Sequence, residues 1–296
     1  MRNLRIVLVC FLLTLPGYAQ VLVPASVDSD RPKVDVESYS IEATIDPFER
    51  ELVVSAEIRF IQQDRQDYAV FDLDRDMRVI DVYLGEEEPL PVRFRQFDID
   101  STLEVDLSDL GQFDQPFIRV EYAGVFRPQE DLGTPILARI DADSAFFLDA
   151  AKWFPMNGVG QDAAIMNLDL TLPSNWQVAS ALSEVNSSEP DFVTGTIEVS
   201  LRGAEPSFWG TLAAGPYESI SSLSDAGVAV EALVFEDSVE AARDMSGAAV
   251  DMFRFYRDTF GEAVAPRFRI VEIEGANWNS RSVPGMLLLP ADAIRS

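Results

Sequence analysis

The sequence predicts a mainly β protein, an antiparallel saddle or sandwich followed by a shorter α+β segment. Three observations support this fold class. Apolar and polar side chains alternate with a period of two in many short runs, turn signals separate these runs, and a helical period appears only after about residue 220. Many short strands with no helix between them are typical of antiparallel sheets that pack face to face.

Residues 1–19 have the pattern of a secretory signal peptide. Arg2 and Arg5 precede an apolar stretch over residues 6–15, and Gly17-Tyr18-Ala19 offers small residues where a signal peptidase cuts. The stretch is shorter than the roughly 20 residues that a membrane span needs. We therefore expect export to the periplasm or the extracellular space, with no membrane attachment after cleavage. Because Cys10 is then removed, the mature chain should have no thiol.

The clearest alternation opens the β part of the chain. Every second side chain is apolar over residues 39–45, Asp46-Pro47 supplies a turn, and the same period resumes over residues 54–60, which predicts a hairpin with one buried face. Similar short runs recur at residues 103–107, 118–122, 168–172 and 197–201. We therefore assign residues 20–222 to an N-terminal β domain.

The period changes in residues 223–296. After a strand near residues 228–235, Asp237 is expected to cap a helix that closes at Gly261, and two further strands follow at residues 267–273 and 286–289. The helix carries one apolar stripe, made by Ala242, Met245, Ala249, Met252, Tyr256 and Phe260. A long helix with so few strands indicates the opening of a second domain.

The charge of the chain limits its partners. There are 50 acidic and 23 basic residues and the formal net charge is −27, so the protein repels nucleic acid and anionic lipid. The acids are scattered, which is typical of a solvated surface. We predict no nucleic-acid partner.

The sequence resembles a known family at several points in order. Lys152-Trp153-Phe154-Pro155, followed by a strand that ends at Pro173 and by Trp176, resembles the central signature of the membrane alanyl aminopeptidase family of zinc metallopeptidases. Residues 39–60, 208–217 and 267–290 are similar to the family's opening hairpin, the strand that closes its N-terminal domain, and the first edge strands of its catalytic domain. The resemblance implies a β domain joined to the start of a thermolysin-like, gluzincin catalytic domain.

The family's chemistry uses a His-Glu-x-x-His helix that holds Zn²⁺ and a glutamate on a second helix. This chain has no histidine. The resemblance therefore implies an N-terminal, non-catalytic portion, with no cofactor and no catalytic residue of its own, although the family in full length is a zinc enzyme. In the family the zinc helix follows the strand expected at residues 286–289, so we expect a truncated chain, inactive as given.

Substrate capture in the family relies on a Gly-Ala-Met-Glu-Asn edge strand, whose glutamate binds the substrate's amino group. Counting back from Gly285 puts Ser282 at the glutamate position, so the resemblance implies Ser282, Val283, Pro284 and Gly285 as the substrate-binding equivalents. Counting from Gly275-Ala276 gives Trp278 instead. Neither residue carries a carboxylate. A peptide substrate is therefore expected only for a full-length protein, with relaxed or altered specificity.

Nearby polar residues have less specific interpretations. A glutamine that the family often carries in its β domain corresponds to Ser144. On a strand, Glu272 and Glu274 are expected to face solvent beside Arg269 or Arg281.

Lys152 is expected to pair with Asp149 or to extend toward solvent rather than to activate a nucleophile. The alternating aspartates at Asp72, Asp74 and Asp76, and at Asp141 and Asp143, could bind Ca²⁺, but solvated strand faces are the simpler interpretation.

The second part of the chain is expected to carry an apolar patch. Trp278, residues 286–289 and the helix stripe would form an apolar patch that promotes self-association if nothing covers them. The alternative to a peptidase fragment is a complete secreted β-sheet module that binds peptides or proteins through its exposed sheet.

Overall fold

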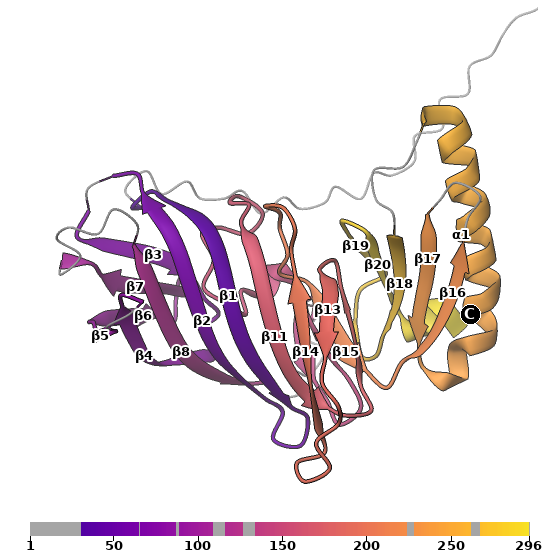
Figure 1. The fold of residues 1–296 in the computed structure, drawn as a ribbon, viewed down its shortest axis with the longest axis horizontal. Helices are drawn as coiled ribbons and strands as arrows, with labels where there is room; N and C mark the ends of the chain where they lie inside the picture. The colour runs from indigo at the N-terminus through magenta and orange to yellow at the C-terminus, as the bar shows by residue number, and fades with distance from the viewer. Residues whose placement is uncertain are drawn as a thin grey trace, which may run out of the picture. The chain divides into compact units, whose positions relative to one another are not determined.

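The structure is a computed structural model that describes residues 31–64, 66–86, 89–108, 116–126, 134–223, 228–261 and 267–295 (Figure 1). The expected signal peptide lies outside the described residues. Strands account for most of the described chain, so the predicted mainly β fold is confirmed.

The first part of the chain is built on an eight-stranded sheet. Its strands, in sheet order, are β13 (Ser183–Ser187), β14 (Thr196–Arg202), β11 (Ile165–Pro173), β1 (Val34–Asp46), β2 (Glu51–Gln62), β8 (Phe117–Val125), β4 (Met77–Leu84) and β5 (Leu90–Pro91). The predicted hairpin is β1–β2, with Ile41 opposite Ala56, and both side chains are buried. Alternation along each strand thus gives the sheet one core face and one solvent face.

The sheet is mixed rather than antiparallel throughout. β1 and β11 run parallel, with Glu42 opposite Asp169, while the other neighbouring strands of this sheet run antiparallel. A period of two in the sequence defines the two faces of a strand but carries no information about its direction. The fully antiparallel expectation is wrong at this pair.

Two smaller sheets share the core face. One has the order β3 (Tyr68–Asp72), β7 (Thr102–Asp106), β6 (Phe94–Phe97), and the other β12 (Gln177–Ser180), β15 (Leu212–Gly215), β10 (Ala145–Phe147), β9 (Ala138–Ile140). Phe60 of the large sheet meets Phe71 of β3 edge to face at 5.6 Å between ring centroids, and Phe147 of β10 belongs to the same buried cluster. The layers therefore form a sandwich around one hydrophobic core.

The family signature lies in that core. A short 3-10 helix, η2 (Asp149–Ala151), ends at Lys152, and Trp153 and Phe154 are then buried. The Trp153 Nε1–H donates to the carbonyl oxygen of Gly210 at 2.6 Å, and the Phe154 ring packs against Tyr39. Trp176 is also buried and closes the turn after Pro173, since its N–H donates to the Pro173 carbonyl. These residues hold the fold together.

The second part of the chain is a five-stranded sheet with one long helix. The strand order is β16 (Glu218–Leu223), β17 (Ala229–Val234), β18 (Arg267–Ile273), β20 (Met286–Pro290), β19 (Arg281–Val283), and β17, β18 and β20 are parallel. Helix α1 (Val239–Phe260) packs on β16 and β17, and α2 (Ala291–Arg295) ends the described chain (Figure 1). Because this sheet begins at β16, its first strand includes residues 218–222, which the predicted boundary placed in the first domain.

The beginning of α1 differs from the prediction and its end agrees. Asp237 lies in a 3-10 turn, η3 (Glu236–Ser238), so Ser238 occupies the N-cap position, and it makes no side-chain capping bond. Gly261 ends the helix with φ 97°, and its N–H donates to the Arg257 carbonyl at 2.8 Å. A glycine suits this position because it lacks the Cβ that disfavours positive φ. No helix among the described residues is long and apolar enough to cross a bilayer.

The apolar stripe of α1 is only partly buried. Ala242 and Ser246 are buried against the sheet, whereas Met252, Tyr256 and Phe260 are 55%, 48% and 79% exposed. The helix has 22 residues and is about 33 Å long, while the six residues of β17 span about 20 Å. The last turns of the helix therefore extend past the strands that cover its first turns.

The other half of the predicted apolar patch is not exposed. Met286 and Leu288 are fully buried because they pack in one hydrophobic cluster with Phe146 of the first domain and Val271 of β18. Trp278 is half-buried, with its ring 6.0 Å from Phe146 in an edge-to-face contact. The expectation of an open face at residues 286–289 is wrong.

Candidate functional site

The four candidate substrate-binding residues form the β19–β20 hairpin. Ser282 lies opposite Leu287, Val283 opposite Met286, and Pro284-Gly285 make the two-residue turn. Proline at the first turn position and φ of 72° at Gly285 fit a type II turn. The structure thus brings the four residues together on one hairpin.

The outer edge of β19 has no neighbouring strand among the described residues. In an antiparallel hairpin the pair that flanks a two-residue turn exchanges hydrogen bonds, and the next pair does not. This alternation predicts that the backbone N–H and C=O of Ser282 face the open edge. The side chains of Ser282 and Pro284 are exposed, so an extended chain could approach there.

No acidic side chain belongs to the hairpin. Its charged residue is Arg281, whose guanidinium carbon lies 5.9 Å from the centre of the Trp278 ring. The edge can therefore offer backbone groups, a serine hydroxyl and a cation, but it has no carboxylate to pair with a peptide's terminal ammonium.

The loop before β19 is fastened to the first domain. The side chain of Asn277 accepts the Ile136 N–H and donates to the Thr134 carbonyl, both at 2.8 Å, and the Trp278 Nε1–H donates to the Ile136 carbonyl at 2.8 Å. Arg139 also donates to the Gly275 carbonyl at 3.2 Å. The first domain thereby fixes where the edge strand begins.

A buried carboxylate supports the same sheet. Glu272 on β18 is fully buried, whereas it was expected to face solvent. It accepts the Phe235 N–H and the Ser238 hydroxyl, each at 2.8 Å, and lies 2.7 Å from the Arg295 guanidinium. Burial lowers the pKa of Arg295, but the attraction of Glu272 and Glu274 is stronger, and the pKa is raised above its ordinary value.

The other expected partners of this region also differ. Arg269 pairs with Glu231 at 2.8 Å and donates to the Ser180 carbonyl, so it is not a partner of Glu272. Ser144 is buried, and its carbonyl closes the β9–β10 turn by accepting the Asp141 N–H. The sequence pattern alone did not predict this network. A glutamate within the apolar run of a strand was the signal that could have indicated a buried carboxylate, because strands of parallel sheets are buried on both faces.

Lys152 is a structural residue. Its ammonium lies 3.1 Å from the Asp72 carboxylate and not beside Asp149, and Asp72 also accepts the Gly158 N–H at 2.9 Å. The side chain of Asp149 accepts the neighbouring Ala150 N–H instead. The pair joins β3 to the signature segment.

The aspartate triplets do not converge on a cation. Asp74 accepts the Asp76 N–H at 2.8 Å, and burial raises the pKa of Asp74. Within the described ranges no three His, Cys, Asp or Glu side chains are grouped so that they could hold a metal ion. A zinc site of the kind that the resemblance implies does not fit these residues, because the chain supplies no imidazole.

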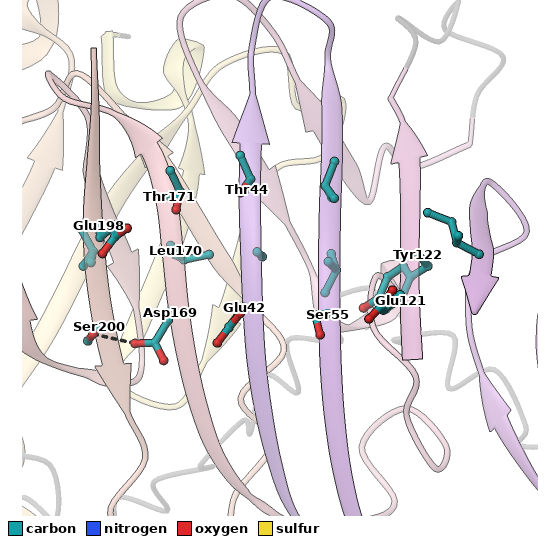
Figure 2. Close-up of a pocket in the computed structure, with 15 residues that line it drawn as sticks. Glu42, Thr44, Ser55, Glu121, Tyr122, Asp169, Leu170, Thr171, Glu198 and Ser200 are labelled. Atoms are coloured by element: carbon teal, nitrogen blue, oxygen red, sulfur yellow. Dashed lines mark hydrogen bonds between the residues drawn. The ribbon is translucent and has the colours of Figure 1, made fainter. Parts of the chain in front are cut away.

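A cavity lies elsewhere, on the solvent face of the eight-stranded sheet. This hollow has a volume of about 580 Å³ and is shown in Figure 2. The strand register aligns one row of its polar side chains, from β14 to β8: Ser200, Asp169, Glu42, Ser55 and Glu121. Alternation predicted these outward positions as solvated faces, but the register that groups them depends on long-range pairing.

Comparison with known proteins gives a clear result for the fold. No family model and no curated protein matches the chain. A two-domain M1 zinc metallopeptidase variant bound to L-arginine superposes with a TM-score of 0.65 at 17% identity, covering 89% of this chain and 62% of that chain.

Two structures of an M1 zinc metallopeptidase from Deinococcus radiodurans are similar to the same extent. One is a variant bound to a Tyr-Ser-Ala substrate, and both have a TM-score of 0.65 and 18% identity. They cover 88% and 90% of this chain, which spans 61% and 62% of theirs. The chain therefore spans about three fifths of the length of these proteins and shares the fold of that part, so the predicted resemblance in fold is confirmed.

Proposed function

We propose that this chain is the N-terminal, non-catalytic portion of an exported aminopeptidase-family zinc metallopeptidase, in which β19 forms the edge that receives an extended peptide. The single observation that carries the proposal is the match of both parts of the chain, β sandwich and five-stranded sheet together, over 88–90% of its length. A sandwich alone hosts many functions. The combination is more specific.

The open edge of β19 supports a peptide as the ligand. An extended peptide can pair with a free edge strand through main-chain hydrogen bonds, and these bonds do not depend on the side chains of the peptide. The neighbouring M1 structures contain a Tyr-Ser-Ala substrate, L-arginine or L-tryptophan. Ligands of this chemistry carry a free amino group, and one of them is a peptide.

Peptide binding without hydrolysis is the activity that these residues support. The zinc ion of the relatives does not fit the residues of this chain, which contains no histidine. No step of amide hydrolysis is therefore assigned to it. We expect no chelator-sensitive turnover of aminoacyl or peptidyl substrates.

Ser282 determines the expected selectivity. A neutral hydroxyl at the position of the family's glutamate cannot neutralise a terminal ammonium, so free and blocked amino termini should bind about equally. Replacing Ser282 by glutamate should restore the preference. An exposed ion pair is worth up to about 1 kcal/mol, or roughly fivefold in affinity.

The test titrates the protein with Tyr-Ser-Ala and with its N-acetylated form. We expect weak binding of both by the parent protein and a several-fold preference for the free amine in Ser282→Glu. Ser183→Glu is a matched control, because Ser183 is another exposed serine on an edge strand, in a different sheet, and it should change neither affinity. Absence of binding by both peptides, or chelator-sensitive hydrolysis, would refute the proposal.

A secreted β-sheet binding module is the second candidate. The observation that favours it is the hollow on the exposed face of the large sheet. Peptide binding at the β19 edge does not make use of this hollow. Under this alternative the Ser282→Glu variant behaves like the parent protein.

A further inference from the structure

Two hairpin tips of the large sheet carry nearly fully exposed apolar side chains. Phe48 in the β1–β2 turn is 90% exposed, and Phe192 and Val193 in the β13–β14 loop are 95% and 94% exposed. β1 and β11 run parallel, and Pro173 at the end of β11 lies opposite Thr196 at the start of β14. Both tips therefore lie at one end of the sheet, and their nearest strands, β14 and β1, are two strand spacings or about 10 Å apart.

Both tips are held by the same local bonds. The Asp46 carboxylate accepts the Phe48 N–H at 2.8 Å, and the Asp191 carboxylate accepts the Val193 N–H at 2.8 Å. The Gly195 N–H also closes the second loop onto the Asp191 carbonyl at 2.7 Å. The backbone of each tip is thus fixed, and the apolar side chains are presented to solvent at little further entropic cost on binding.

The acidic hollow begins beside these tips. Its outer row contains Thr44 and Glu198, which are two residues from the ends of β1 and β14. Asp169 is neutralised by Arg202 at 2.9 Å, but the carboxylates of Glu42 and Glu198 make no hydrogen bond or ion pair with any described residue. The hollow therefore carries negative charge that the surrounding side chains do not balance.

From this arrangement we infer that the tip end of the large sheet docks a cationic amphipathic polypeptide segment. Its apolar side chains contact Phe48, Phe192 and Val193, and its lysine or arginine side chains lie over Glu42 and Glu198. Charge complementarity selects this partner. A second copy of the chain, at a net charge of −27, and an anionic membrane are both repelled. This surface belongs to a different sheet from β19 and does not depend on the proposed function.

The test uses a fluorescein-labelled amphipathic leucine–lysine peptide and follows its anisotropy as the whole protein is added. We expect saturable binding, and none of the matched leucine–glutamate peptide. The triple variant Phe48→Ser, Phe192→Ser, Val193→Ser should bind about tenfold more weakly, because buried aromatic anchors dominate interface energies. Glu42→Gln with Glu198→Gln should weaken binding about tenfold at low salt and have little effect at about 0.5 M salt, where charges are screened.

Two control variants test whether the loss of any exposed apolar or acidic side chain weakens binding. Ile99→Ser removes another apolar side chain that is 96% exposed, and Glu240→Gln removes an exposed acid on α1. Both should bind like the parent protein. All substituted side chains are exposed, and a thermal melt checks that each variant is folded.

Three results would overturn the inference. One is equal binding of the lysine and glutamate peptides. Another is an equal loss in the control variants. The last is adsorption to phosphatidylcholine vesicles that depends on Phe48 and Phe192 but not on Glu42 and Glu198, since that pattern indicates a membrane contact and not a polypeptide partner.

Discussion

The guanidinium of Arg295 lies 2.7 Å from the carboxylate of Glu272, which is fully buried. Through this contact α2 is fastened to β18 and, by way of the Ser238 hydroxyl, to the beginning of α1. One buried carboxylate therefore links β18 to the two helices of the second part of the chain. Glu274 adds a further bond to Arg295 at 2.8 Å.

Removing Arg295 should destabilise the protein. Arg295→Met leaves the Glu272 carboxylate buried without its cation. We expect a loss of about 2–3 kcal/mol in the free energy of unfolding. This is somewhat below the cost of breaking a fully buried pair, because Arg295 is partly exposed. Urea denaturation measures this. Arg254→Met, which removes an exposed ion pair with Asp251, should cost at most about 0.5 kcal/mol. Equal losses in the two variants would show that Glu272 is not the cause.

Stability should fall in alkaline solution. Burial, and next the nearby Glu272 carboxylate, raise the pKa of Tyr217 above its ordinary value of about 10. Because the unfolded state then loses its proton first, the contribution of this tyrosine is fully present below about pH 10 and is lost as the pH rises further.

The melting temperature between about pH 8 and 11 tests this effect. Tyr217→Phe removes the ionisable group and should make the decline above about pH 10 shallower, whereas Tyr256→Phe, at a partly exposed ring on α1, should leave it unchanged. Burial also raises the pKa of Tyr39 and Tyr122, so part of the decline should persist in Tyr217→Phe. Identical pH profiles for Tyr217→Phe and the parent protein would contradict the prediction.

Asp72 should matter more than Asp149 to the stability of the first domain. Asp72→Ala removes the acceptor of both the Lys152 ammonium and the Gly158 N–H, and we expect a loss of about 2–3 kcal/mol in unfolding free energy. Asp149→Ala removes one local bond to the Ala150 N–H and should cost about 1 kcal/mol or less. Thermal denaturation of both variants measures the two losses. A larger loss for Asp149→Ala than for Asp72→Ala would contradict this prediction and favour the Lys152–Asp149 pair.

Self-association, if it occurs through the second part of the chain, should depend on the end of α1. Met252, Phe255 and Phe260 are exposed there, whereas Met286 and Leu288 are buried. We propose that Met252→Ser with Phe260→Ser lowers the concentration-dependent increase in scattered light, because these substitutions remove exposed apolar area. Phe97→Ser, at an exposed aromatic residue of β6, is the control. Unchanged light scattering would show that the end of α1 does not mediate self-association.

Much of the fold could be predicted from the sequence because it depends on local pattern. The alternation over residues 39–60 predicted β1 and β2, and the change of period predicted α1 and its end at Gly261. The parallel pairing of β1 with β11 could not be predicted in this way, since it joins segments more than a hundred residues apart and both directions satisfy the same alternation.

The candidate site was predictable only in part. Counting back from Gly285 along the edge-strand motif of the resembled family singled out Ser282, and this residue lies on the β19–β20 hairpin. The burial of Glu272 was not recognised, since its partners Phe235, Ser238 and Arg295 are distant along the chain. The hollow was missed for the same reason: its row of carboxylates exists only once the strand register is fixed.

The most direct test of the account is the location at which Tyr-Ser-Ala binds. Amide chemical shifts of the isotopically labelled protein, followed during titration with the peptide, report contacts residue by residue. We expect the largest changes at Arg281, Ser282 and Val283, with the peptide recovered intact. Changes concentrated on another sheet, or cleavage of the peptide that a chelator abolishes, would contradict it.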